Sequence, residues 1–379
     1  MRDNNIGAFF ALLRIGLWGD QRSVQQFNVQ VFKDVDWNEV YQLVQEQSLQ
    51  GLVLQGIEEL RAKNKELNVP KVLLLQWIGE VQVIEQRNKA MNIFIGEVVQ
   101  EMREKDINTL LVKGQGVARC YEQPLWRASG DIDFYMSESH FENAKMFFRP
   151  LVESFDPDND VTRHINFHYG KWVVEIHANQ HTDLSFRIDR VLDEIHQKIF
   201  TEGEVRTWDN NGTLVLLPSP ENDVLIVFTH FIKHFFKGGL GLRQICDWCR
   251  LIWKYREALN TSILEQRLRQ MGLFNEWKAF ASMAVDWLGM PQDSMPFYSS
   301  DEKWSKKGGY IIDFILESGN FGHNRDTSYY QHKWRIMRKT GSFMRKVSDI
   351  FRHAYVFPDS IGFIPCIMYN GVKAAIRGE

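Results

Sequence analysis

Two aspartates alternate with an apolar residue in the short segment Asp131-Ile132-Asp133, which follows Gly130. In a strand, residues i and i+2 point to the same face, so the two carboxylates are expected to lie close together. Two negative charges at such a separation are unfavourable unless a cation joins them. An oxygen-preferring divalent ion such as Mg²⁺, shared with substrate phosphates, is the natural partner. The segment therefore predicts a metal site, beside which Gly130 leaves space for a ligand; the alternative is a solvated strand end.

A third carboxylate, Glu175, lies between apolar residues in the run that ends at His177. Val174 and Ile176 occupy the opposite face of the predicted strand, and a charge between such positions is costly if it is buried without a partner. A metal would supply that partner, and three carboxylates suit a two-metal clamp for in-line phosphoryl or nucleotidyl displacement. The alternative is an ion pair of Glu175 with Lys171 or with an arginine across the sheet. His177 shares the face of Glu175, where it contacts a phosphate, orients Glu175 or is an ordinary polar strand edge.

A glycine-containing turn comes before these strands. The apolar segment 107–112 has the length of a strand, ends in Lys113-Gly114 and enters a predicted helix that runs to Tyr121. Such a turn presents backbone N–H groups and a helix N-terminus to phosphate oxygens. Lys113 and Arg127 are expected to add positive charge near a triphosphate, and the alternative for both is a surface salt bridge.

The chain divides into three regions by its apolar periodicity. Residues 1–105 have helical spacing, residues 106–217 mix short strands with a few helices, and residues 218–379 return to helical spacing. This pattern predicts an α+β protein with a central sheet between two helical regions. The expected elements are a helix from Trp37 capped by Asp36 with apolar positions out to Ile57, a long helix from Val69-Pro70 to Lys105, a strand at 131–135, a helix at 137–148, a hairpin of 161–168 and 171–177, a helix from Ser219 to Phe236, and helices at 242–255, 261–271 and 274–288.

The chemistry-bearing residues follow one another in a characteristic order. A strand ending in Lys113-Gly114 and a helix come before Arg127-x-x-Gly-Asp-Ile-Asp133, and a later strand bears a glutamate and a histidine. This order resembles the nucleotidyltransferase superfamily with the DNA-polymerase-β-type core. It resembles more closely the uncharacterised bacterial nucleotidyltransferase family with the Lys-Gly … Arg-x-x-Gly-Asp-Ile-Asp pattern, over roughly residues 36–288.

The resemblance implies an enzyme that transfers a nucleoside monophosphate from an NTP to an acceptor and releases pyrophosphate. By that resemblance Asp131 and Asp133 would ligate Mg²⁺ or Mn²⁺ in a mixed-sheet core, with Glu175 as the third carboxylate. Arg243 and Asp247 also have the i, i+4 spacing of a helix ion pair. The residues expected to contact nucleotide or acceptor are Lys113, Gly114, Arg127, Ser129, Gly130, His177, His230, His234, Arg243 and Asp247.

The phosphate turn departs from the superfamily pattern. The superfamily commonly has Gly-Ser or Gly-Gly there, whereas Gln115 follows Gly114 in this chain. The hydroxyl that would hold a phosphate is therefore missing, and Ser129 is the candidate that replaces it. The alternative function is a catalytically silent nucleotide-binding or protein-binding module that retains the fold.

A second group of metal-ligand residue types lies in the third region. His230 and His234 share one face of a predicted helix, and Cys246 and Cys249 follow them. This spacing permits a structural zinc site, but cysteines in the middle of a helix are usually buried apolar residues. The preferred interpretation places both histidines in a helical wall that faces the active site.

Composition restricts the partners. A formal charge of −3 provides no general attraction for nucleic acid or an anionic membrane, so DNA is not expected as a partner. No stretch approaches about 18 uninterrupted apolar residues, so no membrane span is expected. Four cysteines are too few for a disulfide scaffold and favour a reducing, cytoplasmic location. The expected partners are an NTP and an acceptor that is a small molecule, a protein or an RNA end.

The two ends of the chain carry one feature each. The apolar run from Ile6 to Leu13 is interpreted as an amphipathic helix and not as a signal peptide. The tail from Tyr330 is locally basic and, with Tyr329, Trp334 and Phe343, has two interpretations. It binds RNA or an acidic partner, or it is a solvated helix that packs on the body.

Overall fold

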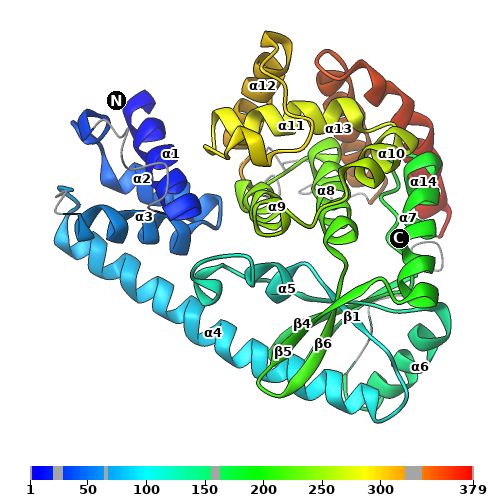
Figure 1. Cartoon of the computed structure of the whole chain (residues 1–379). Coiled ribbons are helices and arrows are strands. Elements are labelled where there is room, and N and C mark those ends of the chain that lie inside the picture. Colours follow the sequence, from blue (N-terminus) through cyan, green and yellow to red (C-terminus); the bar gives the residue numbers. More distant parts are fainter. Residues whose placement is uncertain are drawn as a thin grey trace.

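The computed structural model describes residues 2–19, 29–63, 67–153, 155, 163–320 and 335–377. A six-stranded mixed sheet lies between the helices that come before it and those that follow it along the chain (Figure 1). This arrangement confirms the α+β class that the sequence predicts.

The six strands lie in the order β3-β4-β2-β1-β6-β5. Strand β2 runs parallel to β4 and β1 runs parallel to β6, whereas the other neighbouring pairs are antiparallel. The strands are β1 (Leu110–Val112), β2 (Ile132–Tyr135), β3 (His164–Tyr169), β4 (Trp172–His177), β5 (Val205–Asn210) and β6 (Thr213–Pro218).

Alternation along the central strands gives the sheet two different faces. Phe134 and Val174 are fully buried and belong to an apolar core with residues of α4 (Lys71–Arg103) and α6 (Glu138–Phe148). Helix α4 crosses the whole molecule along this side of the sheet (Figure 1). Asp133 and Glu175 alternate with these apolar residues and therefore belong to the opposite face.

The N-terminal region is helical, as expected, and its first elements are α1 (Arg2–Trp18), η2 (Val29–Phe32), α2 (Trp37–Glu46) and α3 (Gln50–Ala62). Asp36 caps α2, because its side chain accepts hydrogen bonds from two backbone N–H groups of the first turn. The expectation of one helix through Ile57 is wrong. The helix is interrupted between α2 and α3, where Ser48 has a φ of 54°. The long helix after Val69-Pro70 is confirmed as α4.

Helices α1 and α3 cross at two glycines. A Cβ on Gly16 would overlap the backbone carbonyl of Leu52, and a Cβ on Gly56 would overlap that of Leu12. The two backbones therefore touch at this crossing, and only glycine allows such a close approach. The crossing helps to hold the N-terminal helices together beside α4.

The loops around the central strands contain short helices. The turn after β1 forms α5 (Gly114–Ala118), so the expected helix through Tyr121 ends early, and η3 (Pro124–Trp126) follows. Ser137 caps α6 through its hydroxyl. The expected hairpin is confirmed as β3 and β4, although residues 161 and 162 lie outside the described ranges.

The helices after the sheet pack together on the side of its polar face (Figure 1). The expected helices there are confirmed, although α11 ends before the predicted Leu288 and Ser219 makes no capping bond with its side chain. Helix α7 and the β5–β6 hairpin have no counterpart among the expected elements. Helix α7 (Phe186–Glu202) lies between β4 and β5 in the chain. The helices after the sheet are α8 (Pro220–Lys237), α9 (Leu242–Tyr255), α10 (Thr261–Met271), α11 (Phe274–Asp286), η4 (Gln292–Ser294), α12 (Glu302–Ser318), α13 (Arg335–Ala354), η7 (Pro358–Phe363) and α14 (Ile364–Arg377).

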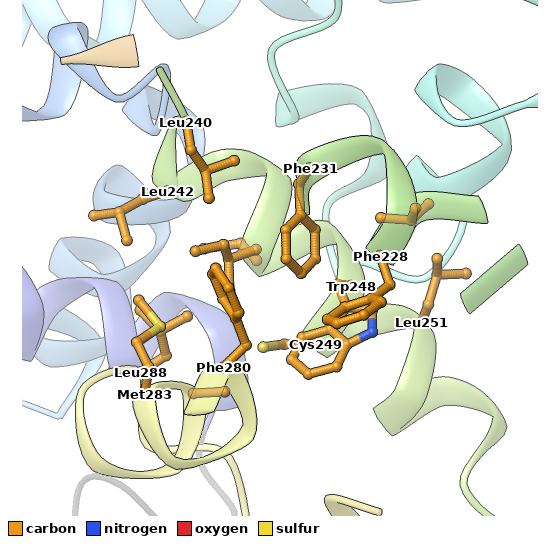
Figure 2. Close-up of a cluster of buried hydrophobic side chains, with 14 of the residues drawn as sticks. Phe228, Phe231, Leu240, Leu242, Trp248, Cys249, Leu251, Phe280, Met283 and Leu288 are labelled. Atoms are coloured by element: carbon orange, nitrogen blue, oxygen red, sulfur yellow. The ribbon is translucent and has the colours of Figure 1, made fainter. Parts of the chain in front are cut away.

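A second apolar core holds these helices together. Phe228 of α8 contacts Trp248 of α9 and Phe280 of α11, and Cys249 lies among them (Figure 2). The basic tail joins this core, because His353 of α13 is fully buried. Residues 329, 330 and 334 of the tail lie outside the described ranges. None of the described helices combines the length and the apolar character that crossing a membrane needs.

Candidate active site

A cavity of about 310 Å³ lies over the polar face of the sheet. Its walls come from the ends of the central strands, from the turn after β1, and from α8 and α9. The structure brings all the sequence-predicted site residues except Ser129 to this cavity: Lys113, Gly114, Arg127, Gly130, Asp131, Asp133, Glu175, His177, His230, His234, Arg243 and Asp247.

Three carboxylates meet on the sheet. Asp133 of β2 lies directly across from Glu175 of β4, and Asp131 comes just before β2. One oxygen from each of the three lies within 4.8 Å of the others. Asp131 is exposed by surface area, yet its surroundings desolvate the carboxylate, and this desolvation together with the charge of Asp133 raises the pKa of Asp131. Oxygen donors at this spacing are suited to a divalent cation such as Mg²⁺.

Lys113 reaches the same carboxylates from the end of β1. Its Nζ atom lies 2.7 Å from Oδ1 of Asp133. Burial would lower the pKa of Lys113, but the negative charges around it, of which Asp133 is the largest contributor, together outweigh burial and raise the pKa. The backbone carries this residue at a φ of 56°, an uncommon value for a residue with a side chain, and Gly114 follows at 39°. In this structure the ammonium group therefore pairs with Asp133, beside the position where the sequence predicts a triphosphate.

Two histidines contact the carboxylate of Glu175. Nε2 of His164 and Nε2 of His177 lie 3.2 and 3.4 Å from the same oxygen, Oε2 of Glu175. Burial would raise the pKa of Glu175, but the hydrogen bonds from both rings and the positive charges of His177 and Lys113 together outweigh burial and hold the pKa well below its usual range. Glu175 is therefore ionised in this site. His177 also lies 3.3 Å from Oδ1 of Asp133, so it orients two carboxylates at once.

Arg127 is committed to a buried ion pair. Its Nε and Nη2 atoms each lie 2.6 Å from one oxygen of Asp247, in a two-pronged arrangement. Tyr121 donates a hydrogen bond of 2.7 Å to the same carboxylate. Asp247 therefore pairs with Arg127, whereas Arg243 of the same helix donates to the carbonyl oxygen of Ala128. The i, i+4 ion pair that the spacing permits is replaced by a contact between two distant parts of the chain.

Ser129 and Gln115 face away from the cavity. The amide nitrogen of Gln115 donates to Oδ1 of Asn88 on α4 and to Oγ of Ser129. Arg127 donates to the same hydroxyl. Ser129 is thus occupied within a buried hydrogen-bond network that ties the turn after β1 to α4, and its hydroxyl does not line the cavity.

The two histidines of α8 form one side of the cavity. Nε2 of His230 lies 3.2 Å from Nε2 of His234, and burial lowers the pKa of both rings, that of His234 to about 3. Both are therefore neutral near pH 7. Among the described residues, neither groups with Cys246 or Cys249 into a set of three possible metal ligands. Both thiols lie in the apolar core, as Figure 2 shows for Cys249.

Several residues of the cavity wall were not predicted from the sequence. Tyr135 lies two residues after Asp133 on the same strand face, and His164 lies across the hairpin from His177, so strand pairing is the signal for both. Gln180 and Gln244 also line the cavity, and the sequence gives no signal for them. Both amide atoms of Gln180 and Oε1 of Gln244 are buried without a hydrogen-bond partner among the described residues.

Comparison with known proteins supplies the family. No curated protein and no solved structure matches the chain. The model of a family described as uncharacterised nucleotidyltransferase matches residues 33–289, which is more than half of the chain and includes the sheet and the whole cavity. Three carboxylates on a mixed sheet, next to a lysine at the end of β1, agree with that match. The chain therefore belongs to the uncharacterised nucleotidyltransferase family.

Proposed function

We propose that the protein transfers a nucleoside monophosphate from an NTP to an acceptor and releases pyrophosphate. The observation that carries this proposal is the meeting of Asp131, Asp133 and Glu175 at the floor of a cavity, in a chain of this family. We place the reaction in the cytoplasm, because all four cysteines are free and buried. The acceptor is a small molecule, a protein or an RNA end, and DNA is not expected.

The three carboxylates would hold Mg²⁺ or Mn²⁺, and the bound ion would supply positive charge that offsets the charge developing during displacement. Glu175 is suited to this task because its depressed pKa keeps it ionised. His164 and His177 hold its carboxylate in position. Lys113 supplies a fixed positive charge beside Asp133 before any ligand enters.

In the proposed reaction, the oxygen of an acceptor hydroxyl forms a bond to the α-phosphorus of the NTP. The bond from that phosphorus to the bridging oxygen of the β-phosphate breaks, and pyrophosphate leaves with both electrons of the bond. The hydroxyl proton passes to solvent. Arg243 and Lys233 line the cavity and would attract the triphosphate. The unpartnered amide of Gln180 supports a polar ligand, because buried amide groups are normally hydrogen-bonded.

The test uses the full chain with each of the four NTPs, Mg²⁺ or Mn²⁺, and a cell extract as the source of acceptors. We expect metal-dependent NTP binding by calorimetry and release of pyrophosphate. We expect the Asp131→Asn, Asp133→Asn double variant to lose pyrophosphate release. His168→Gln is the matched control, since this side chain is exposed on the neighbouring strand β3. Equal pyrophosphate release by the double variant and the control would overturn the mechanism.

The same experiment identifies the second candidate function. Ser129 and Gln115 turn away from the cavity, so no serine hydroxyl serves the phosphate turn. NTP binding without pyrophosphate release in any extract would favour a nucleotide-binding module without catalysis. The helical walls of the cavity would then be the surface on which to look for a protein partner.

A further inference from the structure

A mixed group of nitrogen and oxygen ligands lies beside the three carboxylates. Nε2 of His164, Nε2 of His177 and a carboxylate oxygen of Glu175 all lie within 4.8 Å of one another. We propose that these three residues bind a divalent transition-metal ion, of the class of Zn²⁺, Co²⁺ or Cu²⁺. This site would share Glu175 with the carboxylate group. It stands on ligand geometry alone and does not depend on the proposed transfer reaction.

Strand pairing builds this group. In the β3–β4 hairpin His164 lies directly across from His177, and Asn166 lies directly across from Glu175. Residues directly across an antiparallel pair share a face, and so do residues two apart along a strand. The four side chains therefore form a compact block on the polar face of the sheet. Asp133 of β2 lies directly across from Glu175 on the other side of β4. The four side chains of the hairpin therefore lie next to the three carboxylates.

The distances match those between ligands of one ion. Ligand atoms bound at about 2.1 Å from a metal lie roughly 3.0–3.4 Å apart at neighbouring corners of an octahedron or tetrahedron. Nε2 of His164 lies 3.2 Å from Oε2 of Glu175, and Nε2 of His177 lies 3.4 Å from the same atom. The two rings stack with centroids 4.4 Å apart and planes 17° apart, and the Nε2 atoms of both lie beside the same carboxylate oxygen.

The chemistry of the ligands selects the class of ion. Imidazole nitrogen suits Zn²⁺, Cu²⁺ and other transition metals, whereas Mg²⁺ and Mn²⁺ are normally held by carboxylate oxygens and water. A fourth donor is at hand, because Oδ1 of Asn166 is buried and has no hydrogen-bond partner among the described residues. His164 also lines the cavity, so an ion can enter from the ligand side. The two metal sites that share Glu175 would then differ in their ligands. The carboxylate site would have oxygen ligands, whereas the second site would have two imidazole nitrogens in addition to Glu175.

The test measures Co²⁺ binding by the tag-free, metal-free full chain without nucleotide, through the visible absorption of Co²⁺. We expect His164→Gln and His177→Gln each to weaken Co²⁺ binding at least tenfold, since each removes a ligand. His168→Gln should bind Co²⁺ like the natural chain, because His168 is exposed two positions beyond Asn166 on the same strand face.

A measurement on the natural chain makes the test independent of variant folding. Pulsed electron paramagnetic resonance of bound Cu²⁺, an ion that imidazole ligands favour, should show coupling to the nitrogens of two imidazoles. The proposal is overturned if the natural chain binds no Co²⁺, if His164→Gln and His168→Gln bind it equally, or if bound Cu²⁺ shows no nitrogen coupling. Because no NTP is present, a failure of nucleotidyl transfer leaves these readouts unchanged, and the two proposals fail separately.

Discussion

Lys113 and Asp133 form a buried ion pair at the floor of the cavity, with Nζ 2.7 Å from Oδ1. The sheet fixes their proximity, because Val112 at the end of β1 lies across from Asp133 in β2. The side chain of Asp133 is only 3% exposed, so its charge has little contact with water. A surface pair with nearly the same distance, Lys89 and Glu85 at 2.6 Å, has a lysine that is 56% exposed.

Replacing Lys113 is expected to cost much more stability than replacing Lys89. Lys113→Gln leaves the buried carboxylate of Asp133 without its lysine partner and with only the contact to His177, which should lower the free energy of unfolding by about 3 kcal/mol. Lys89→Gln removes an exposed i, i+4 pair and should change it by less than about 0.5 kcal/mol. Urea denaturation of both variants measures the difference. Similar midpoints and slopes for the two would show that burial does not control the strength of this pair.

The second ion pair of the cavity joins Arg127 to Asp247 across a large separation in sequence. The Nε and Nη2 atoms of the guanidinium group each lie 2.6 Å from one carboxylate oxygen of Asp247. A lysine would offer a single point charge instead of these two parallel hydrogen bonds. Arg127→Lys is therefore expected to lower the free energy of unfolding by about 2 kcal/mol, and Asp247→Asn by about 3 kcal/mol. Arg190→Lys, in an exposed pair with Glu194, is the matched control. An Arg127→Lys variant as stable as this control would contradict the assigned role.

Local patterns predict those parts of the fold that depend on neighbours in sequence. The N-cap at Asp36, the long α4 and the β3–β4 hairpin all follow from periodicity and capping residues. Helix α7 carries the same kinds of signal, since Ser185 caps it and Gly203 ends it in the left-handed conformation. The β5–β6 hairpin turns at Asn211-Gly212, both with positive φ, which is a typical hairpin turn. Both elements could therefore have been predicted from the sequence.

Contacts between distant segments lie beyond such patterns. The type and order of residues indicate that Asp133 and Glu175 belong to one site, but not that Lys113 pairs with Asp133. Likewise, spacing offers Asp247 a partner on its own helix, and only tertiary packing gives it Arg127 instead. Ion-pair partners depend on burial and on register, which are set by the whole fold and not by the local sequence.

The cysteines of α9 are expected to behave as apolar residues and not as metal ligands. Burial raises the pKa of Cys246 and Cys249, so neither thiol is ionised near neutral pH. Cobalt titration of the natural chain should therefore give no sulfur-to-metal charge-transfer band, and Cys246→Ala should leave the amount of bound Co²⁺ unchanged. A thiol reagent should label both residues only as fast as the chain unfolds. A charge-transfer band that Cys246→Ala abolishes would restore the zinc interpretation.

Glu276 of α11 should make the chain less stable as pH rises. Its side chain is 1% exposed, its Oε2 atom has no hydrogen-bond partner among the described residues, and burial raises its pKa to about 7. In the unfolded chain the ordinary pKa of about 4.3 applies, so between roughly pH 4.3 and 7 the folded state binds more protons than the unfolded state. Protonation of Glu276 therefore favours the fold, and this advantage is lost as pH rises to 7.

Glu276→Gln removes the titration and keeps the shape of the side chain. Relative to this variant, the natural chain should lose about 2–3 kcal/mol in free energy of unfolding between pH 5 and pH 8. Urea denaturation at both pH values measures the change. Glu257→Gln is the control, because the side chain of Glu257 is 89% exposed, and it should follow the natural chain at both pH values. If the free energy of unfolding of Glu276→Gln equals that of the natural chain at both pH values, Glu276 does not titrate in this range.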